Sequence, residues 1–178
     1  SDSDKILQTC QAKGILCDKR PKAFSADETT TAATIKEFIQ SGRGKYNLDQ
    51  NDWIIIAEPT SPFRRLETLD LLLDAIESNK FDSIYTVYKS SAVEWVEGKD
   101  FWSRKDNVDG SLSRRQTRPS KYHECGVFYA TKVKNITSGS ILGKNSHCIE
   151  VDSTEALDIN SPLDLEICRT LSNQLNEA

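Results

Sequence analysis

The sequence predicts an α/β fold in which a mostly parallel sheet is flanked by helices. Residues 53–56 and 83–88 are apolar and rich in β-branched side chains, which is typical of buried strands, and residues 66–78 between them have the apolar content of a helix. This strand–helix–strand order is that of a crossover connection between parallel strands. With 178 residues, the chain is long enough for one domain over 1–178 with its own core.

The first part of the chain supplies two helices and a short strand. Acidic and hydroxyl residues at the start can cap a helix over 4–13, which Gly14 then ends. The apolar residues 15–17 follow as a short buried strand. A cluster of capping residues at 27–31 begins a second helix that runs to about Ser41.

The strand at 53–56 is apolar throughout, so we expect it to be buried on both faces at the centre of the sheet. Further strands are predicted at 126–130 and 147–151. The last helix begins at Ser161, a favoured capping residue, and Pro162 suits its first position.

The pattern changes at about residue 90. Residues 90–120 have no helical period but carry Trp95, Phe101 and Trp102, together with turn signals such as Asp109-Gly110. We expect an extended or β-hairpin arm, whose exposed aromatic side chains need a partner surface.

Composition excludes several classes of function. The net charge of −4 gives no basic surface for nucleic acid, and no apolar stretch is long enough for a membrane span. The five cysteines form no CxxC pair, which favours reduced thiols and a cytoplasmic location. No signal peptide is recognisable in the printed sequence, so we expect the glycosylation sequon at Asn135 not to be used. Because methionine is absent even at position 1, we expect the sequence to begin inside a longer protein or after processing.

The loop after the strand at 53–56 is the first candidate site. It reads Glu58-Pro-Thr-Ser-Pro62 and is followed by the basic pair Arg64 and Arg65. Ligands of open α/β sheets bind just beyond the carboxyl ends of the strands, so these groups are placed to meet an anion. An ordinary loop stopped by proline is the alternative.

Four segments, in order along the chain, resemble the acylneuraminate cytidylyltransferase family, the CMP-sugar synthetases. The loop at 58–64 is similar to that family's Q-P-T-S-P-L-R. Three further segments follow other family patterns: Arg20-Pro21 with Asp27 and Thr29–Thr31, Arg115–Pro119 with Tyr122, Gly126 and Tyr129, and Asp158-Ile-Asn-Ser-Pro-Leu-Asp164.

The resemblance implies a Rossmann-like nucleotidyltransferase sheet and cytidylyl transfer from CTP to an acidic ulosonic sugar, with Mg²⁺ and release of pyrophosphate. Asp158 and Asn160 would hold the Mg²⁺, and Arg115 would face the phosphates or the sugar carboxylate. From the residues alone, Asp158 could instead cap the last helix, and Arg115 could belong to a solvated basic loop.

The resemblance also assigns binding residues and a partner. Cytidine would be approached by Arg20, Thr30 and Thr31, and the sugar by Glu58, Thr60, Ser61, Gln116, His123 and Cys125. The arm at 90–120 would pack on a second subunit and make a homodimer.

Several positions depart from the family pattern. Glu58 stands in place of a glutamine, His123 and Cys125 replace an arginine and an asparagine, and Asn160 replaces a second carboxylate. These changes favour an acidic sugar other than sialic acid. The Gly- and Lys-rich phosphate loop that opens the family's fold has no counterpart here. The alternative function is therefore a non-catalytic remnant or fragment that binds a nucleotide sugar or a partner subunit.

Overall fold

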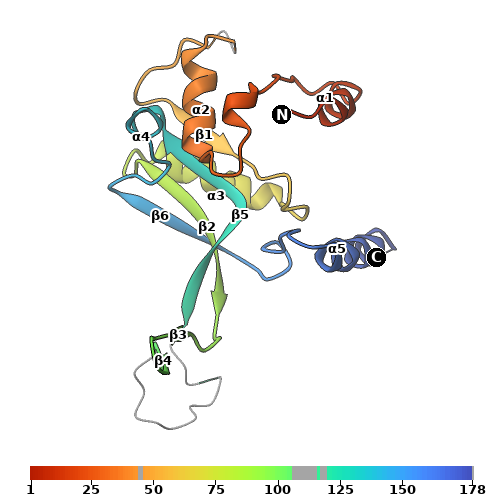
Figure 1. Ribbon diagram of the computed structural model, residues 1–178, viewed down its shortest axis with the longest axis vertical. Coiled ribbons are helices and arrows are strands. Elements are labelled where there is room, and N and C mark those ends of the chain that lie inside the picture. The colour runs from red at the N-terminus through yellow and green to blue at the C-terminus, as the bar shows by residue number, and fades with distance from the viewer. Residues whose placement is uncertain (44–45, 106–115, 117–119, 178) are drawn as a thin grey trace. The chain divides into compact units, whose positions relative to one another are not determined.

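The computed structural model describes residues 1–43, 46–105, 116 and 120–177 of the chain. Its main sheet has four strands in the order β1 (Trp53–Ile56), β5 (Lys121–Lys132), β2 (Ser83–Ser90) and β6 (Ser146–Val151) (Figure 1). Helix α3 (Leu66–Glu77) connects β1 to β2. The predicted α/β class is confirmed.

The chain divides into two compact units. One consists of residues 1–56, 72–84 and 129–147, and the other of 57–71, 85–128 and 148–178. Each has its own buried apolar residues: the first includes Leu72, Ile84, Val133 and Ile136, and the second includes Val87, Val127, Ile149 and Val151. Burial of such side chains stabilises each unit through the hydrophobic effect.

The N-terminal segment contains two of the predicted elements but not the third. Helix α1 (Asp4–Gln11) is capped by Ser3, whose side chain accepts from the Ile6 N–H, and helix α2 (Thr31–Gln40) follows a short 3₁₀ turn, η1 (Lys22–Phe24). The predicted strand at 15–17 is wrong, because these residues pair with no strand and the Leu16 side chain is 90% exposed.

Strand β1 forms where it was predicted, but its surroundings differ. It pairs antiparallel with β5 in a register that sets Trp53 opposite Lys132 and Ile56 opposite Tyr129. Within the described residues it is an outer strand of the sheet, and Ile55 is 40% exposed. The prediction of a central strand buried on both faces is therefore wrong, since an apolar run indicates a strand without fixing how many neighbours it has.

The described part of the predicted arm contains one pair of strands. Strands β3 (Trp95–Glu97) and β4 (Trp102–Arg104) form an antiparallel pair beyond the outer ends of β2 and β5 (Figure 1). Trp95 and Trp102 are 57% and 58% exposed. At its base, the Glu94 carboxylate accepts from Lys121 at 3.1 Å, and this contact lowers the pKa of Glu94.

Helix α4 (Val133–Ser138) was not predicted and lies directly after β5. Its residue Asn135 is buried, and the amide nitrogen donates to the Asp82 carbonyl at 2.8 Å and to Thr131 Oγ1 at 3.1 Å. Asn135 of the sequon is therefore a structural residue of the core, and its side-chain nitrogen is hydrogen-bonded within the protein.

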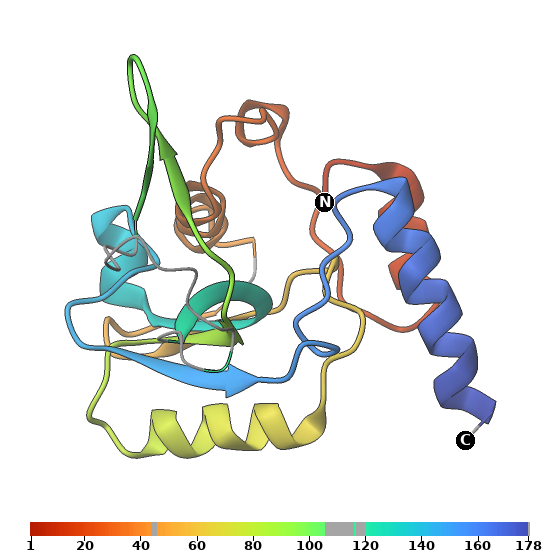
Figure 2. The same cartoon turned by 90° about the horizontal axis from the view of Figure 1, so that it is seen from below.

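The chain leaves β6 through a looped segment and ends in helix α5 (Pro162–Glu177) (Figure 2). The start of α5 is built as predicted: the Asp164 N–H donates to Ser161 Oγ, which in turn donates to the Asp164 carboxylate at 2.8 Å. These bonds satisfy the free groups of the first helical turn.

Candidate functional site

The loop after β1 packs closely on β5. The Glu58 N–H donates to the Gly126 carbonyl at 3.3 Å, and the Ser61 N–H donates to the Glu58 carbonyl at 3.2 Å. A Cβ atom at Gly126 would lie 3.2 Å from Glu58 Cβ and from Ser61 Oγ, so glycine permits this close approach. Ser61 is buried, whereas Glu58 and Thr60 are partly exposed.

Arg64 folds back from this loop onto β5. Its Nε donates to the Val127 carbonyl at 2.7 Å, and its guanidinium carbon lies 5.6 Å from the centre of the Phe128 ring. Burial lowers the pKa of Arg64 from its ordinary value, and the nearby Glu58 carboxylate acts in the opposite direction. Within the described structure, its buried Nη2 has no hydrogen-bond partner.

Arg65 joins this loop to the one that follows β6. Its Nη2 lies 2.5 Å from Asp152 Oδ2, and its backbone N–H donates to Glu155 Oε1 at 3.1 Å. Asp152 Oδ1 also accepts from the backbone N–H groups of Glu155 and Thr154, and these bonds, with Arg65, lower the pKa of Asp152. Of the two basic residues predicted to meet an anion, Arg65 thus has a carboxylate partner, whereas Arg64 donates only its Nε to a protein acceptor and its Nη2 has none among the described residues.

Asp158 lies beside the first loop. The next residue, Ile159, donates its N–H to the Thr60 carbonyl at 3.0 Å. Asp158 Oδ2 accepts from Asn160 Nδ2 at 2.9 Å, while Oδ1 is buried and has no partner among the described residues. A buried carboxylate oxygen without a donor is costly, so this atom is suited to a cation.

The alternative role for Asp158, as a cap of α5, is filled by other residues. The Asp164 carboxylate accepts from Ser161 Oγ and from the Asn160 N–H, and these bonds lower the pKa of Asp164. Within the described part of the chain, no cluster of three or more His, Cys, Asp or Glu side chains could hold a metal ion. Mg²⁺ needs only one or two carboxylates when phosphates and water complete its shell, so Asp158 fits such an ion.

His123 and Cys125 point to the same side of β5, two residues apart. The His123 ring stacks on Tyr88, with centroids 5.4 Å apart, and its buried Nε2 has no hydrogen-bond partner in the described structure. Cys125 is 7% exposed, and burial raises the pKa of its thiol. Thr86 Oγ1 lies 2.9 Å from the Cys125 carbonyl and fixes the strand there.

The predicted nucleotide-binding residues lie in the other compact unit. Arg20 Nη2 bonds Asp2 Oδ1 at 2.9 Å, which lowers the pKa of Asp2. Thr30 caps α2 by accepting the Ala33 N–H at 3.1 Å, and Thr31 is exposed in the first turn. Gln116 is exposed, and Arg115 lies outside the described residues. Their roles toward a ligand stay predictions.

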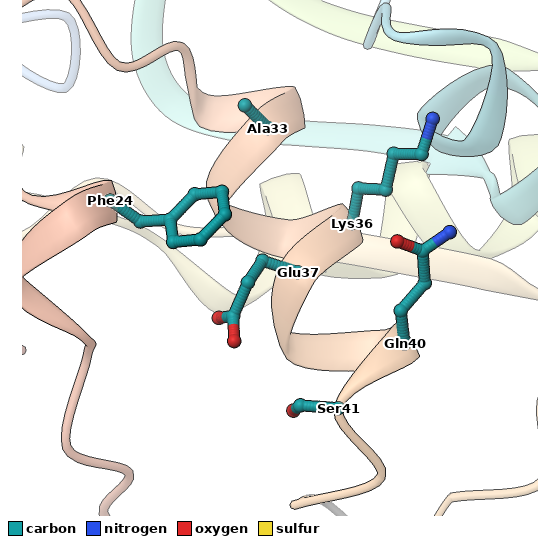
Figure 3. Close-up of a pocket in the computed structure, with 6 residues that line it drawn as sticks. All are labelled: Phe24, Ala33, Lys36, Glu37, Gln40 and Ser41. Carbon is teal, nitrogen blue, oxygen red and sulfur yellow. The ribbon is translucent and has the colours of Figure 1, made fainter.

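Two hollows have no sequence motif that could have revealed them. One, of about 450 Å³, lies beside α2, where the side chains of Phe24 and Glu37 face each other and Lys36 points away toward α4 (Figure 3). Its charged groups are already paired, since Lys36 donates to the Thr137 carbonyl and Glu37 binds Arg43. The other, of about 390 Å³, lies against α5 and is lined by Pro62, Phe63, Ile159, Leu165, Cys168, Arg169, Ser172 and Leu175.

No protein-family model matches the chain. Among curated proteins, it is 26% identical over 168 residues to N-acylneuraminate cytidylyltransferase A of Danio rerio. That alignment covers 92% of this chain and 38% of the relative, so the chain spans well under half of the relative's length.

Solved structures of similar fold are also nucleotide-handling enzymes by name. The CMP:2-keto-3-deoxy-manno-octonic acid synthetase complexed with CTP has a TM-score of 0.67 and 16% identity, covering 97% of this chain and 78% of that one. A 4-diphosphocytidyl-2C-methyl-D-erythritol synthase has a TM-score of 0.64 and 12% identity, covering 96% and 78%. The corresponding synthase of Anaerococcus prevotii gives 0.60 and 13%, covering 97% and 74%. These likenesses confirm the predicted resemblance and the Rossmann-like fold.

Proposed function

We propose that this chain carries the chemistry of a cytidylyltransferase, which transfers CMP from CTP to an acidic ulosonic sugar and releases pyrophosphate. The observation that carries the proposal is the free Oδ1 atom of Asp158, buried next to the loop at 58–62. The likeness to an N-acylneuraminate cytidylyltransferase and to a synthetase complexed with CTP supports the choice of nucleotide.

The reaction joins two anions, so it depends on positioning and on positive charge. A hydroxyl of the sugar attacks the α-phosphate of CTP, the bond from that phosphorus to the bridging oxygen breaks, and pyrophosphate leaves. Asp158 would hold Mg²⁺, with Asn160 beside it, and the ion would offset the phosphate charge when bound. Arg115 and Gln116 are proposed to face the phosphates and the sugar.

Cytidine is proposed to lie near Arg20, Thr30 and Thr31. The proposed sugar side is formed by Glu58, Thr60, Ser61, His123 and Cys125. A carboxylate at position 58 would repel an acidic sugar if it were uncompensated. The nearby Arg64 guanidinium, whose pKa the Glu58 carboxylate acts to raise, is proposed to offset this charge.

A homodimer is part of the proposal. Trp95 on β3 and Trp102 on β4 are each more than half exposed, and aromatic side chains are enriched at protein interfaces. The described residues contain no helix that is both long and apolar enough to cross a membrane. A cytoplasmic location stays a prediction.

Pyrophosphate release tests the proposal directly. The chain is incubated with CTP, Mg²⁺ and a panel of ulosonic acids, and the same reactions are run with the D158A variant. We expect release with at least one acid, and a loss of about a hundredfold or more in D158A, since one preorganised charged group is worth that much. Asp70→Ala, which changes an exposed carboxylate on α3, is the matched control and should retain the rate. A D158A rate equal to that of D70A would contradict the proposal.

A non-catalytic binding protein is the second candidate. The bond from the Asn160 amide to Asp158 Oδ2 favours it, because it occupies one of the two carboxylate oxygens that could hold a metal. In that case no acid supports turnover, but CMP-sugar binding, measured by isothermal titration calorimetry, remains.

A further inference from the structure

The two loops that meet at Asp158 share a buried carboxylate for which no motif accounts. Glu155 is 2% exposed and lies three residues before Asp158. Its backbone N–H donates to Asp152 Oδ1 at 3.0 Å, so its position in the turn after β6 is fixed. A carboxylate so deeply buried is costly unless hydrogen bonds compensate its charge.

The carboxylate of Glu155 is directed at the other loop. Its Oε1 accepts the backbone N–H of Arg65 at 3.1 Å. Glu155 therefore lies where the loop after β1 and the loop after β6 meet. Two further bonds join these loops: the ion pair of Arg65 with Asp152, and the bond from the Ile159 N–H, directly after Asp158, to the Thr60 carbonyl.

We propose that Glu155 is a positioning residue, which holds the loop at 58–65 against the turn at 152–160 so that Asp158 stays beside Thr60. The inference rests on the proposed function for the role of Asp158, but the coupling between the loops can be measured without turnover. Glu155 itself does not touch the substrate in this assignment. It acts through the Arg65 N–H and, beyond it, through the bond between Ile159 and Thr60.

Amide hydrogen exchange of the whole chain, followed by NMR, tests this coupling. In Glu155→Ala, the Arg65 amide loses its acceptor, and we expect the Ile159 amide to exchange about tenfold faster as well, as for the loss of one hydrogen bond. Glu155→Gln retains an acceptor oxygen and should restore protection at both amides. Glu150→Ala, an exposed position on β6, is the matched control and should change neither amide.

The outcomes are distinct. If only the Arg65 amide responds to E155A, or if E155Q exchanges as fast as E155A, Glu155 does not position Asp158 and the inference is wrong. If E155A does not fold, Glu155→Asp takes its place, because its side chain is one methylene shorter and moves the carboxylate away from the Arg65 N–H. The exchange rates of the Arg65 and Ile159 amides are then compared between this variant and E155Q. The Ser41 amide of α2, which donates to the Glu37 carbonyl at 2.9 Å in the other unit, reports any global loss of stability.

Turnover separates this inference from the proposed function. In a chain that releases pyrophosphate, E155A should lower the rate and E155Q should retain it. A chain without turnover that shows the expected exchange pattern contradicts the proposed function and leaves the coupling intact. A chain with turnover whose Ile159 amide does not respond to E155A contradicts the coupling alone.

Discussion

Replacing Gly143 by alanine should destabilise the protein through a single buried carboxylate. A Cβ atom at this position would lie 1.9 Å from Asp82 Oδ1 and 2.9 Å from Asn135 Nδ2, whereas real contacts of this kind stay beyond 3.0 Å. Asp82 is 6% exposed and accepts the N–H groups of Lys144 and Asn145 at 3.3 and 3.0 Å. The carboxylate must therefore move, and water cannot replace the bonds that it loses.

The size of the effect follows from those two bonds. A hydrogen bond to a buried charged group is worth about 1.5 kcal/mol or more, so we expect a loss of about 3 kcal/mol in the free energy of unfolding. For a chain of this length, that corresponds to a fall of roughly 6–12 °C in Tm. Urea unfolding followed by circular dichroism and tryptophan fluorescence measures the change.

Gly139→Ala is the matched control. Gly139 has φ +94° and no atom within 4 Å of an added Cβ, so alanine there introduces backbone strain without a clash. Such strain costs about 1–2 kcal/mol. If G143A is no less stable than G139A, then Asp82 accommodates the methyl group freely, and the reasoning from its hydrogen bonds is wrong.

Three further predictions concern pH, thiol chemistry and modification. Hydrogen bonds from Arg43 lower the pKa of Glu37 below its ordinary 4.5. Their stabilising effect is therefore complete above pH 4.5 and is lost as the pH falls through the lowered pKa. The E37Q variant should make the urea midpoint depend less on pH between pH 3 and 6. Burial raises the pKa of the Cys125 thiol, so iodoacetamide should label exposed Cys148 first, and mass spectrometry showing equal labelling would contradict the burial. When the purified, folded chain is treated with an oligosaccharyltransferase, Asn135 should stay unglycosylated because its amide is buried and bonded, which peptide mapping would check.

Local patterns in the sequence predict most elements but not their neighbours. The β-branched run at 53–56 marks a strand, and Ser161-Pro162 marks the start of α5, because both signals are local. The number of strands that pair with β1 is a property of the whole sheet, so the four residues of β1 do not determine it. For the same reason, the apolar residues 15–17 failed as a strand prediction: Leu16 has no sheet to pack on.

The candidate site divides in a similar way. The resemblance assigned Asp158 and the loop at 58–62 to one site, and the bond from the Ile159 N–H to the Thr60 carbonyl holds these two segments side by side. The roles of their residues stay predictions. The sequence did not predict a role for Glu155, because a single glutamate in a polar loop belongs to no recognisable motif. Only its burial in the structure distinguishes it. Helix α4 was missed since its six residues include β-branched side chains of low helix propensity.

Crystals of the chain grown with CTP and Mn²⁺, a substitute for Mg²⁺ with an anomalous signal, test the central claim most directly. We predict a manganese peak within coordination distance of Asp158 Oδ1, beside the phosphates of the nucleotide. CTP bound with its metal held elsewhere, and Asp158 Oδ1 still without a ligand, would contradict the account.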